Sequence, residues 1–386
     1  MAMILLLFVA NYTTFTAARS VLSTLQGYQE TKYINQEGVY IANLDPYSSI
    51  DMGRINKSGT QAVYDYLNNN FDYAFYADGF MVSVPNTDDM EISLGYMNEA
   101  YYTLNQFELS QGKDLEFDYQ FDGEIPVLIG TGLSKTYPVG STITVEESAL
   151  ERPLTLRVQG ILKSNANHSN FYALNSKAYY NFSILVPVNE EFINHANIDL
   201  QWNGLMDITI LETTRAEAAE LGDVIEDNLG AKFNFFSQQE SYDYFNEYYV
   251  HSLKIMAVIT LVLLVIITCF SIWNGLVSVR LMMKDFTINL LVGLSYSKLR
   301  KVFYGYWGIL SFINLMVISV FTVSNRYGCW LRKDTTFVTY GLFGLIGMDW
   351  LALLVVVLLD VVIGIVIVEN MLRKIKKIPI SLGVLQ

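Results

Sequence analysis

The chain has 386 residues, of which 52% are hydrophobic and only 16% charged, and its formal net charge is −13. Soluble domains usually have about a quarter of their residues charged, so this composition points away from an ordinary soluble protein. Residues 1–250 carry 12 basic and 33 acidic residues, whereas residues 251–386 carry 13 basic and five acidic ones. The acidic half would repel nucleic acid, which we exclude as a partner.

The chain begins with an apolar segment, MAMILLLFVANYTTFTAA. A cleaved signal peptide is one interpretation, because Ala17 and Ala18 are small residues of the kind found near cleavage sites. No basic residue precedes the apolar core, however, as a signal peptide requires. We therefore prefer a first transmembrane helix over residues 1–19.

Residues 20–252 form a continuous polar region without a membrane span. Alternating apolar residues predict strands at 39–41 and 154–158, and longer periodic segments predict helices at 60–70 and 215–228. Two glycines, Gly130 and Gly140, border predicted strands, where a turn needs a positive φ. We interpret the Asn-rich segment 163–180 as a polar loop. Strands that alternate with helices predict an α+β domain.

Two apolar segments, residues 253–277 and 303–324, are each long enough to cross a bilayer core of roughly 30 Å as a helix, and the first has no charged residue from Ile255 to Leu276. The segment between them, residues 278–302, carries five basic residues and one acid. By the positive-inside rule this net-positive loop lies in the cytoplasm.

A further apolar segment, residues 350–371, predicts a fourth helix, with Asp349 as its N-cap. Residues 325–349 are then an extracytoplasmic loop, and the basic tail, residues 372–386, is cytoplasmic. The sequence therefore predicts an α-helical membrane protein with four transmembrane helices and a large α+β extracytoplasmic domain inserted between helices 1 and 2.

Asp360 is the one charged residue well inside a predicted span. Burying an ionised acid in hydrocarbon is unfavourable, so Asp360 should face the helix bundle and find a polar partner or stay protonated. Asn274 and Asn314, in the second and third helices, are candidate partners. Two roles are open for Asp360: a hydrogen bond between helices, or gating and coupling.

The basic loop reads KDFTINLLVGLSYSKLRKVF from residue 284. This sequence resembles the cytoplasmic loop of the MacB/FtsX-type permeases of ABC transporters, which has a basic-acidic-apolar start and a hydrophobic-Gly-x-Ser end. The positions we assign to this loop are Lys284, Asp285, Phe286, Ile288, Leu290, Val292, Gly293 and Ser295. Three residues depart from the family pattern, namely Thr287, Leu290 and Leu291. Segments 107–118 (FELSQGKDLEFD) and 154–162 (LTLRVQGIL) are also similar to family segments.

The resemblance implies a permease subunit of the cell membrane that crosses the bilayer several times. Two copies would pair, and two ABC ATPase subunits, which bind ATP and Mg, would dock on the loops. A membrane fusion protein is a further partner that some relatives use. The four-helix arrangement of the family also favours the transmembrane interpretation of residues 1–19. By the same resemblance the substrate would be a peptide or a hydrophobic compound.

The chain itself lacks the motifs of an enzyme. The pair Gly112-Lys113 lacks the rest of a nucleotide-binding loop, and no Cys/His spacing suits a metal ion. We therefore expect no cofactor in this chain and no catalysis by it. One alternative is an FtsX-like regulator that activates an external cell-wall hydrolase or sensor, and another is a receptor without an ATPase. The size of the external domain, about 230 residues, favours the MacB branch over the FtsX branch.

Overall fold

The computed structural model describes residues 2–34, 36–87, 90–146, 148–171, 173–281, 295–331 and 342–377. The chain divides into two compact units. One is a helical unit made of Met1–Ser23, Tyr248–Asn325 and Gly344–Gln386, and the other is an α+β unit made of Thr24–Glu247 and Arg326–Phe343.

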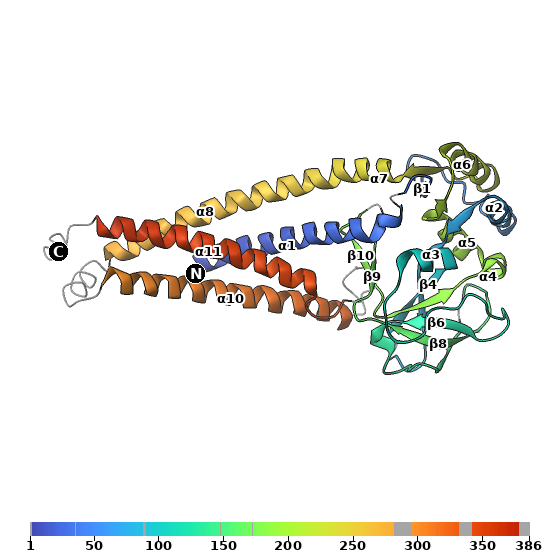
Figure 1. The fold of residues 1–386 in the computed structure, drawn as a ribbon, viewed down its shortest axis with the longest axis horizontal. Coiled ribbons are helices and arrows are strands. Elements are labelled where there is room, and N and C mark those ends of the chain that lie inside the picture. Colours follow the sequence, from blue (N-terminus) through green and yellow to red (C-terminus); the bar gives the residue numbers. More distant parts are fainter. Residues whose placement is uncertain are drawn as a thin grey trace. The chain divides into compact units, whose positions relative to one another are not determined.

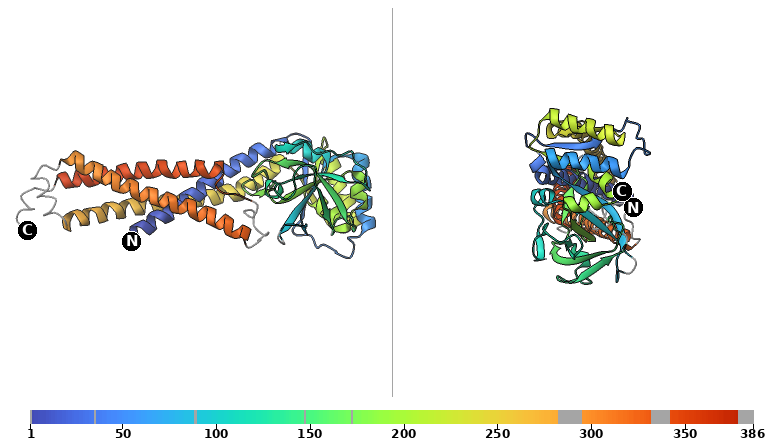
Figure 2. Two further views of the ribbon diagram at one scale, coloured as in Figure 1. Left: turned by 90° about the horizontal axis from the view of Figure 1, so that it is seen from below. Right: turned by 90° about the vertical axis from the view of Figure 1, so that its right-hand side faces the viewer.

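Long apolar helices build the helical unit (Figures 1 and 2). They are α1 (Ala2–Glu30), which continues into the other unit, α8 (His251–Leu281), α10 (Tyr296–Leu331) and α11 (Gly347–Lys376). Among the described residues, these four are long and apolar enough to cross a membrane. The four spans expected from the sequence fall on them, but each helix is longer than its expected span. The residues by which these helices exceed the expected spans include no proline, which would break a helix.

Helices α1, α10 and α11 share two apolar cores, and Leu264 and Ile272 of α8 pack against the first of them. Trp307 and Leu310 of α10 pack with Leu7 of α1 and with Ile363 of α11, and a second cluster joins Phe15 of α1 to the same two helices. Helix α8 differs, since only 6% of its apolar span is buried, compared with 44% for α11. The outward surface of α8 is therefore apolar and largely free of packing within this chain.

Two larger sheets, a separate two-stranded hairpin and several helices form the α+β unit (Figures 1 and 2). In spatial order the larger, seven-stranded sheet contains β3 (Tyr76–Ser83), β4 (Glu91–Met97), β11 (Ser183–Pro187), β6 (Ile125–Ile129), β8 (Leu154–Leu162) and β5 (Leu109–Gly112), with β7 (Thr142–Val145) also paired to β8. The smaller sheet contains β13 (Phe233–Ser237), β1 (Tyr40–Leu44), β12 (Thr209–Leu211) and β2 (Asp72–Ala74). The larger sheet is mixed, because β11 pairs with β4, and β6 with β8, in parallel.

Burial follows from the sequence of the central strands. Strands β6 and β11 are buried at every position, and they read as continuous apolar runs, IPVLI and SILVP, as strands covered on both faces do. The helices of this unit are α2 (Lys57–Asn70), α3 (Glu99–Asn105), α4 (Glu190–His195), α5 (Ile198–Met206), α6 (Arg215–Leu229) and α7 (Gln238–Phe245). The expected helices at 60–70 and 215–228 correspond to α2 and α6, and the strands and helices confirm an α+β unit.

Gly140 and Gly130, the two glycines that border strands, are required for different physical reasons. Gly140 has a φ of +89°, as the sequence predicts for a turn. Gly130 has a φ of −69°, so the expectation of a positive φ is wrong there. A Cβ atom at Gly130 would lie only 1.8 Å from the carbonyl oxygen of Tyr180, so close approach of two backbones requires this glycine.

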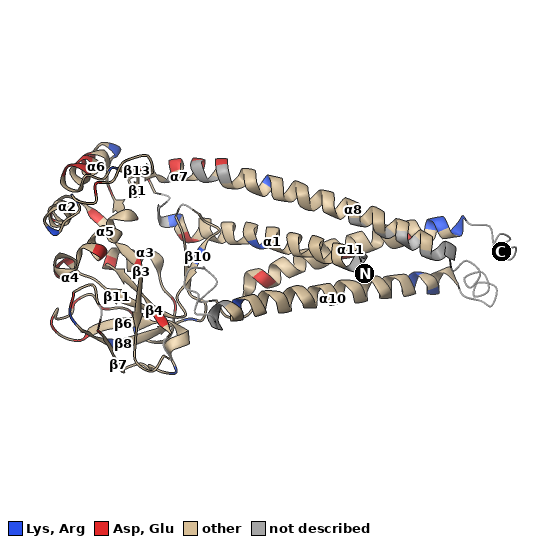
Figure 3. Cartoon of the chain, turned by 180° about the vertical axis from the view of Figure 1, so that it is seen from behind, with Lys and Arg blue, Asp and Glu red and all other residues tan. Residues whose placement is uncertain are grey.

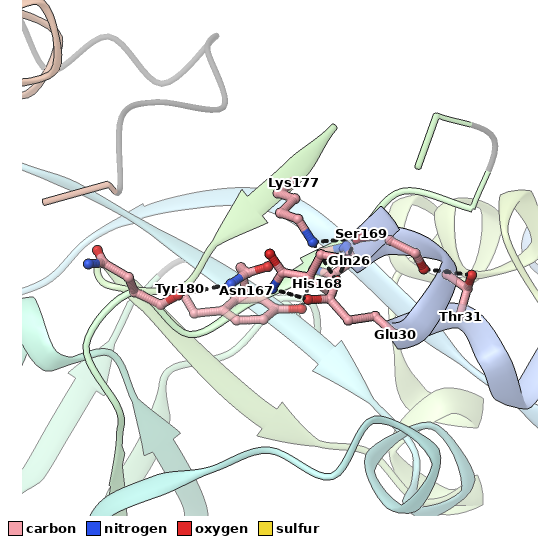
Figure 4. Close-up of polar contacts among 10 residues, drawn as sticks. Gln26, Glu30, Thr31, Asn167, His168, Ser169, Lys177 and Tyr180 are labelled. Carbon is pink, nitrogen blue, oxygen red and sulfur yellow. Dashed lines mark hydrogen bonds and ion pairs between the residues drawn. The ribbon is translucent and has the colours of Figure 1, made fainter. Parts of the chain in front are cut away.

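The expectation of a polar loop at 163–180 is also wrong. This segment contains an antiparallel hairpin, β9 (Asn167–Ser169) and β10 (Lys177–Tyr179), which contacts the last turn of α1. Lys177 Nζ donates to Glu30 Oε2 at 2.7 Å and to Ser169 Oγ at 2.8 Å (Figure 4). Gly27 permits the contact, because a Cβ there would lie 2.2 Å from the carbonyl oxygen of Leu174.

Candidate functional site

Most of the loop that resembles the ATPase-docking segment lies outside the described residues. This holds for Lys284, Asp285, Phe286, Ile288, Leu290, Val292 and Gly293. Ser295 is described, and its Oγ accepts a hydrogen bond from the backbone N–H of Lys298 at 3.3 Å. Ser295 therefore begins α10 as a capping residue, as the sequence suggests. Contact of this segment with an ATPase stays a prediction.

The first turns of α10 are tied to the last turns of α11. The Arg300 guanidinium meets the Glu369 carboxylate through both oxygens, with Nε 3.0 Å from Oε1 and Nη2 3.2 Å from Oε2. Tyr304 Oη also donates to Glu369 Oε1 at 3.2 Å, and Lys376 Nζ lies 5.5 Å from the centre of the Tyr296 ring. Two-point contact between arginine and a carboxylate fixes geometry as well as distance. The start of α10 and the end of α11 are therefore held together in a defined geometry.

This end of the helical unit is also its basic end. Figure 3 shows Lys and Arg at the start of α10 and towards the C-terminal end of α11. Arg373, Lys374 and Lys376 occupy the last turn of α11. The cluster has the same sign of charge as the loop between α8 and α10, on which the expected orientation depends.

Asp360 lies in the middle of the helical unit and is 3% exposed. Its Oδ2 accepts a hydrogen bond from Nδ2 of Asn11 on α1 at 3.0 Å. The backbone oxygen of Asp360 accepts a second bond, from Trp307 Nε1 on α10 at 2.9 Å. Trp307 fits there because residue 364 is glycine, where a Cβ would lie 2.4 Å from Trp307 Cδ1. One residue thus links three helices through buried polar contacts.

Of the two partners proposed from the sequence, Asn314 makes a different contact, whereas Asn274 stays a prediction. Asn314 is buried, but its Nδ2 donates to the Leu310 carbonyl of its own helix at 2.9 Å. Asn274 lies in α8, and its side chain is not among those described. Sequence reasoning missed Asn11, although Asn11 is the first amide in the opening apolar segment and was a detectable signal.

A second polar link joins α1 to α11. Arg19 Nε lies 2.9 Å from Asp349 Oδ1, and the Asp349 side chain is fully buried. The expected N-cap role of Asp349 needs correction, because the capping position is Ile346. Asp349 lies three residues later, and its Oδ2 accepts the backbone N–H of Ile346 at 2.9 Å. The carboxylate therefore still satisfies an otherwise unpaired donor at the helix start.

The order of the two contacts along α1 is the reverse of their order along α11. Along α1, Asn11 precedes Arg19 by about 12 Å, and along α11, Asp349 precedes Asp360 by about 16 Å, at about 1.5 Å per residue. Asn11 pairs with Asp360 and Arg19 pairs with Asp349. The links therefore fix α1 and α11 as antiparallel neighbours at two separate heights.

No protein-family model matches the chain, and a search of curated proteins finds no match. Among solved structures, the periplasmic region of MacB from Actinobacillus actinomycetemcomitans is similar over 55% of this chain and 94% of its own, at 13% identity and a TM-score of 0.34. The extracellular domain of the noncanonic ABC-type transporter YknZ from Gram-positive bacteria is similar over 51% of this chain and 99% of its own, at 14% identity and a TM-score of 0.30.

A domain of a protein described as a permease, from Porphyromonas gingivalis, is similar over 52% of this chain and 90% of its own, with 12% identity and a TM-score of 0.31. These three structures are a periplasmic region, an extracellular domain and a permease domain.

Proposed function

We propose that this chain is the permease subunit of an ATP-driven ABC system of the MacB type, with the α+β unit outside the cell. The observation that carries the proposal is the order of its parts. An α+β unit of about 220 residues lies in the chain between apolar helices α1 and α8. The basic segment between α8 and α10 then has the sequence pattern of a loop that docks on an ATPase.

The helices suggest how such a subunit would work. Helical structure is continuous from α7 through the short π-helix Asn246–Val250 to the end of α8 at Leu281. An ATPase that moves the loop after α8 would therefore pull on a helix that leads directly into the α+β unit. In this mechanism the chain transmits motion, contributes no catalysis itself and leaves ATP and Mg to its partner. The substrate, a peptide or a hydrophobic compound, stays a prediction from the family resemblance.

The packing of α8 supports a paired arrangement. Its outward residues include Val258, Leu261 and Trp273, which are 60%, 63% and 71% exposed. A helix that is apolar all round and little packed needs lipid or another helix around it. We place a second copy of the chain against α8, with lipid on the remaining surface.

Truncation of Phe286 tests the proposal. Loss of a buried aromatic anchor at an interface commonly costs about 2 kcal/mol, or about thirtyfold in affinity. We expect Phe286→Ala to lower co-purification with the ATPase encoded beside this chain, and to uncouple ATP turnover in nanodiscs, while the permease stays folded in the membrane.

Phe312→Ala is the matched control, because Phe312 lies in α10 and is 63% exposed. This variant should bind the ATPase normally. Undiminished binding and turnover in both Phe286→Ala and Gly293→Pro would show that the loop is not the coupling element, and the proposal would fail.

A further inference from the structure

A small cavity of about 280 Å³ lies within the α+β unit, between β3, the hairpin β9–β10 and the end of α5. Its chemistry is set by aromatic and acidic side chains, namely Tyr76, Asp78, Tyr101, His168, Phe171 and Asp207. The volume is close to the lower end of the range of ligand sites, roughly 300–1,000 Å³, so a ligand here would be small.

Stacked rings make up one side of the cavity. Tyr76 and Tyr101 lie with their centres 4.6 Å apart and their planes 8° from parallel. The His168 ring meets Tyr76 edge-on, with 5.1 Å between centres, and His168 Nδ1 shares a hydrogen bond with Tyr180 Oη (Figure 4). Aromatic side chains attract cations through the negative face of the ring, and such contacts strengthen when water is excluded.

Two carboxylates also line the cavity, and neither Asp78 nor Asp207 has an ion-pair partner among the described residues. Asp78 accepts one hydrogen bond, from Tyr76 Oη at 3.1 Å. Asp207 follows the last residue of α5, where the helix dipole is negative and a positive charge is favoured.

The other charged groups around the cavity do not neutralise these acids. Lys177 is already paired with Glu30 at 2.7 Å (Figure 4). Burial lowers the pKa of His168 below 6.5, so the ring is neutral at pH 7. Burial, with the nearby charge of Asp78, raises the pKa of Asp207 to about 6. Both Asp78 and Asp207 are exposed to solvent, and none of the described residues that line the cavity is Lys or Arg. The two acids are therefore open to a cation from solution, which their carboxylates would stabilise.

We propose that this cavity binds a small organic cation, a primary or quaternary amine, with its charge between the carboxylates of Asp78 and Asp207 and its alkyl part against the Tyr76–Tyr101 stack. An organic cation fits better than a metal ion, because the described residues contain no group of three His, Cys, Asp or Glu side chains that could hold a metal. The site belongs to the α+β unit alone and does not depend on the proposed ATPase.

Calorimetry on the full chain in nanodiscs tests the proposal, with choline and butylammonium as probes. Each probe has an uncharged analogue of similar shape, 3,3-dimethylbutan-1-ol and butan-1-ol. We expect at least one cation to bind saturably at pH 7.5, and its analogue to bind about tenfold more weakly or not at all. Absence of saturable binding by both cations, or equal binding of the analogues, would overturn the proposal.

Variants locate the site and separate it from general surface charge. Asp207→Asn and Tyr76→Leu should each weaken binding by about tenfold. Asp223→Asn removes the same charge from an exposed position on α6 and should leave binding unchanged. Binding should also weaken as the pH falls through 6, because Asp207 then gains a proton. Equal losses of affinity in Asp207→Asn and Asp223→Asn would mean that the cation binds only to the acidic surface in general, and the proposed site would be wrong.

Discussion

The two units of this chain treat apolar side chains in opposite ways. In the α+β unit the largest side chains, such as Tyr64, Phe75 and Tyr96, are fully buried. In the helical unit large apolar side chains point outward, and the fully buried positions include Asp349, with Asp360 and Asn11 nearly so. The difference agrees with the length and apolar composition of these helices, which are sufficient to cross a membrane, where exposed apolar and enclosed polar side chains are favourable.

The same contrast applies to the two buried ion pairs, both of which involve α1. Arg19 meets a fully buried Asp349 in the helical unit, whereas Glu30 meets Lys177, which is 2% exposed, in the α+β unit. In each pair one member is fully or almost fully buried and the other reaches the surface. Removing the partly exposed member should therefore take an ion-pair contact away from a buried charge in both units, with different consequences.

The largest effect is expected for Arg19→Gln. Breaking a buried pair by removing one partner costs about 3 kcal/mol or more, because the remaining charge stays desolvated. We expect the free energy of unfolding in SDS to fall by about that amount. The control is Arg300→Gln, whose pair with Glu369 is partly exposed and should contribute less than about 1 kcal/mol. Equal effects of the two variants would contradict the role of burial.

Glu30→Gln should have a smaller effect, of about 2 kcal/mol. Burial already lowers the pKa of Lys177, and Glu30 opposes this change. Without Glu30 the pKa should fall further, so the folded chain would release a proton more readily than the unfolded chain. The variant should therefore regain stability as the pH rises towards 10.5, the ordinary lysine value. Thermal unfolding followed by circular dichroism between pH 7 and 10 measures this, and a flat profile would contradict the prediction.

The smallest effect is expected at Asp360. Asp360→Asn keeps a group that can bond to Asn11, so assembly and ATP turnover should persist. Asp360→Leu leaves Asn11 unpaired and should lower stability by about 1 kcal/mol, in line with polar contacts between membrane helices. If Asp360→Asn abolishes turnover while the protein assembles normally, the charge itself is functional rather than the hydrogen bond.

Local signals were sufficient for many elements of the α+β unit. Helix α6 begins with Thr214 and Glu217, which bond to each other's backbone N–H groups, and ends at Gly230 with a φ of 65°. These are short-range effects, and they can be predicted from sequence because each depends on residues within one or two turns. The hairpin β9–β10 could not be predicted in this way, because its partner Glu30 is 147 residues from Lys177.

The sequence by itself determined where the apolar helices lie, that a large α+β unit stands between the first two, and that the ends of the later helices are basic. Hydrophobic length, charge and periodicity are properties of the chain alone. Only the tertiary structure decided that Asp360 meets Asn11, that Asn314 bonds within its own helix, and that Asp349 meets Arg19. It also decided that Asp78, Asp207 and the Tyr76–Tyr101 stack share one cavity. These pairings depend on which helix faces and strand ends come together in space, and no local pattern encodes them.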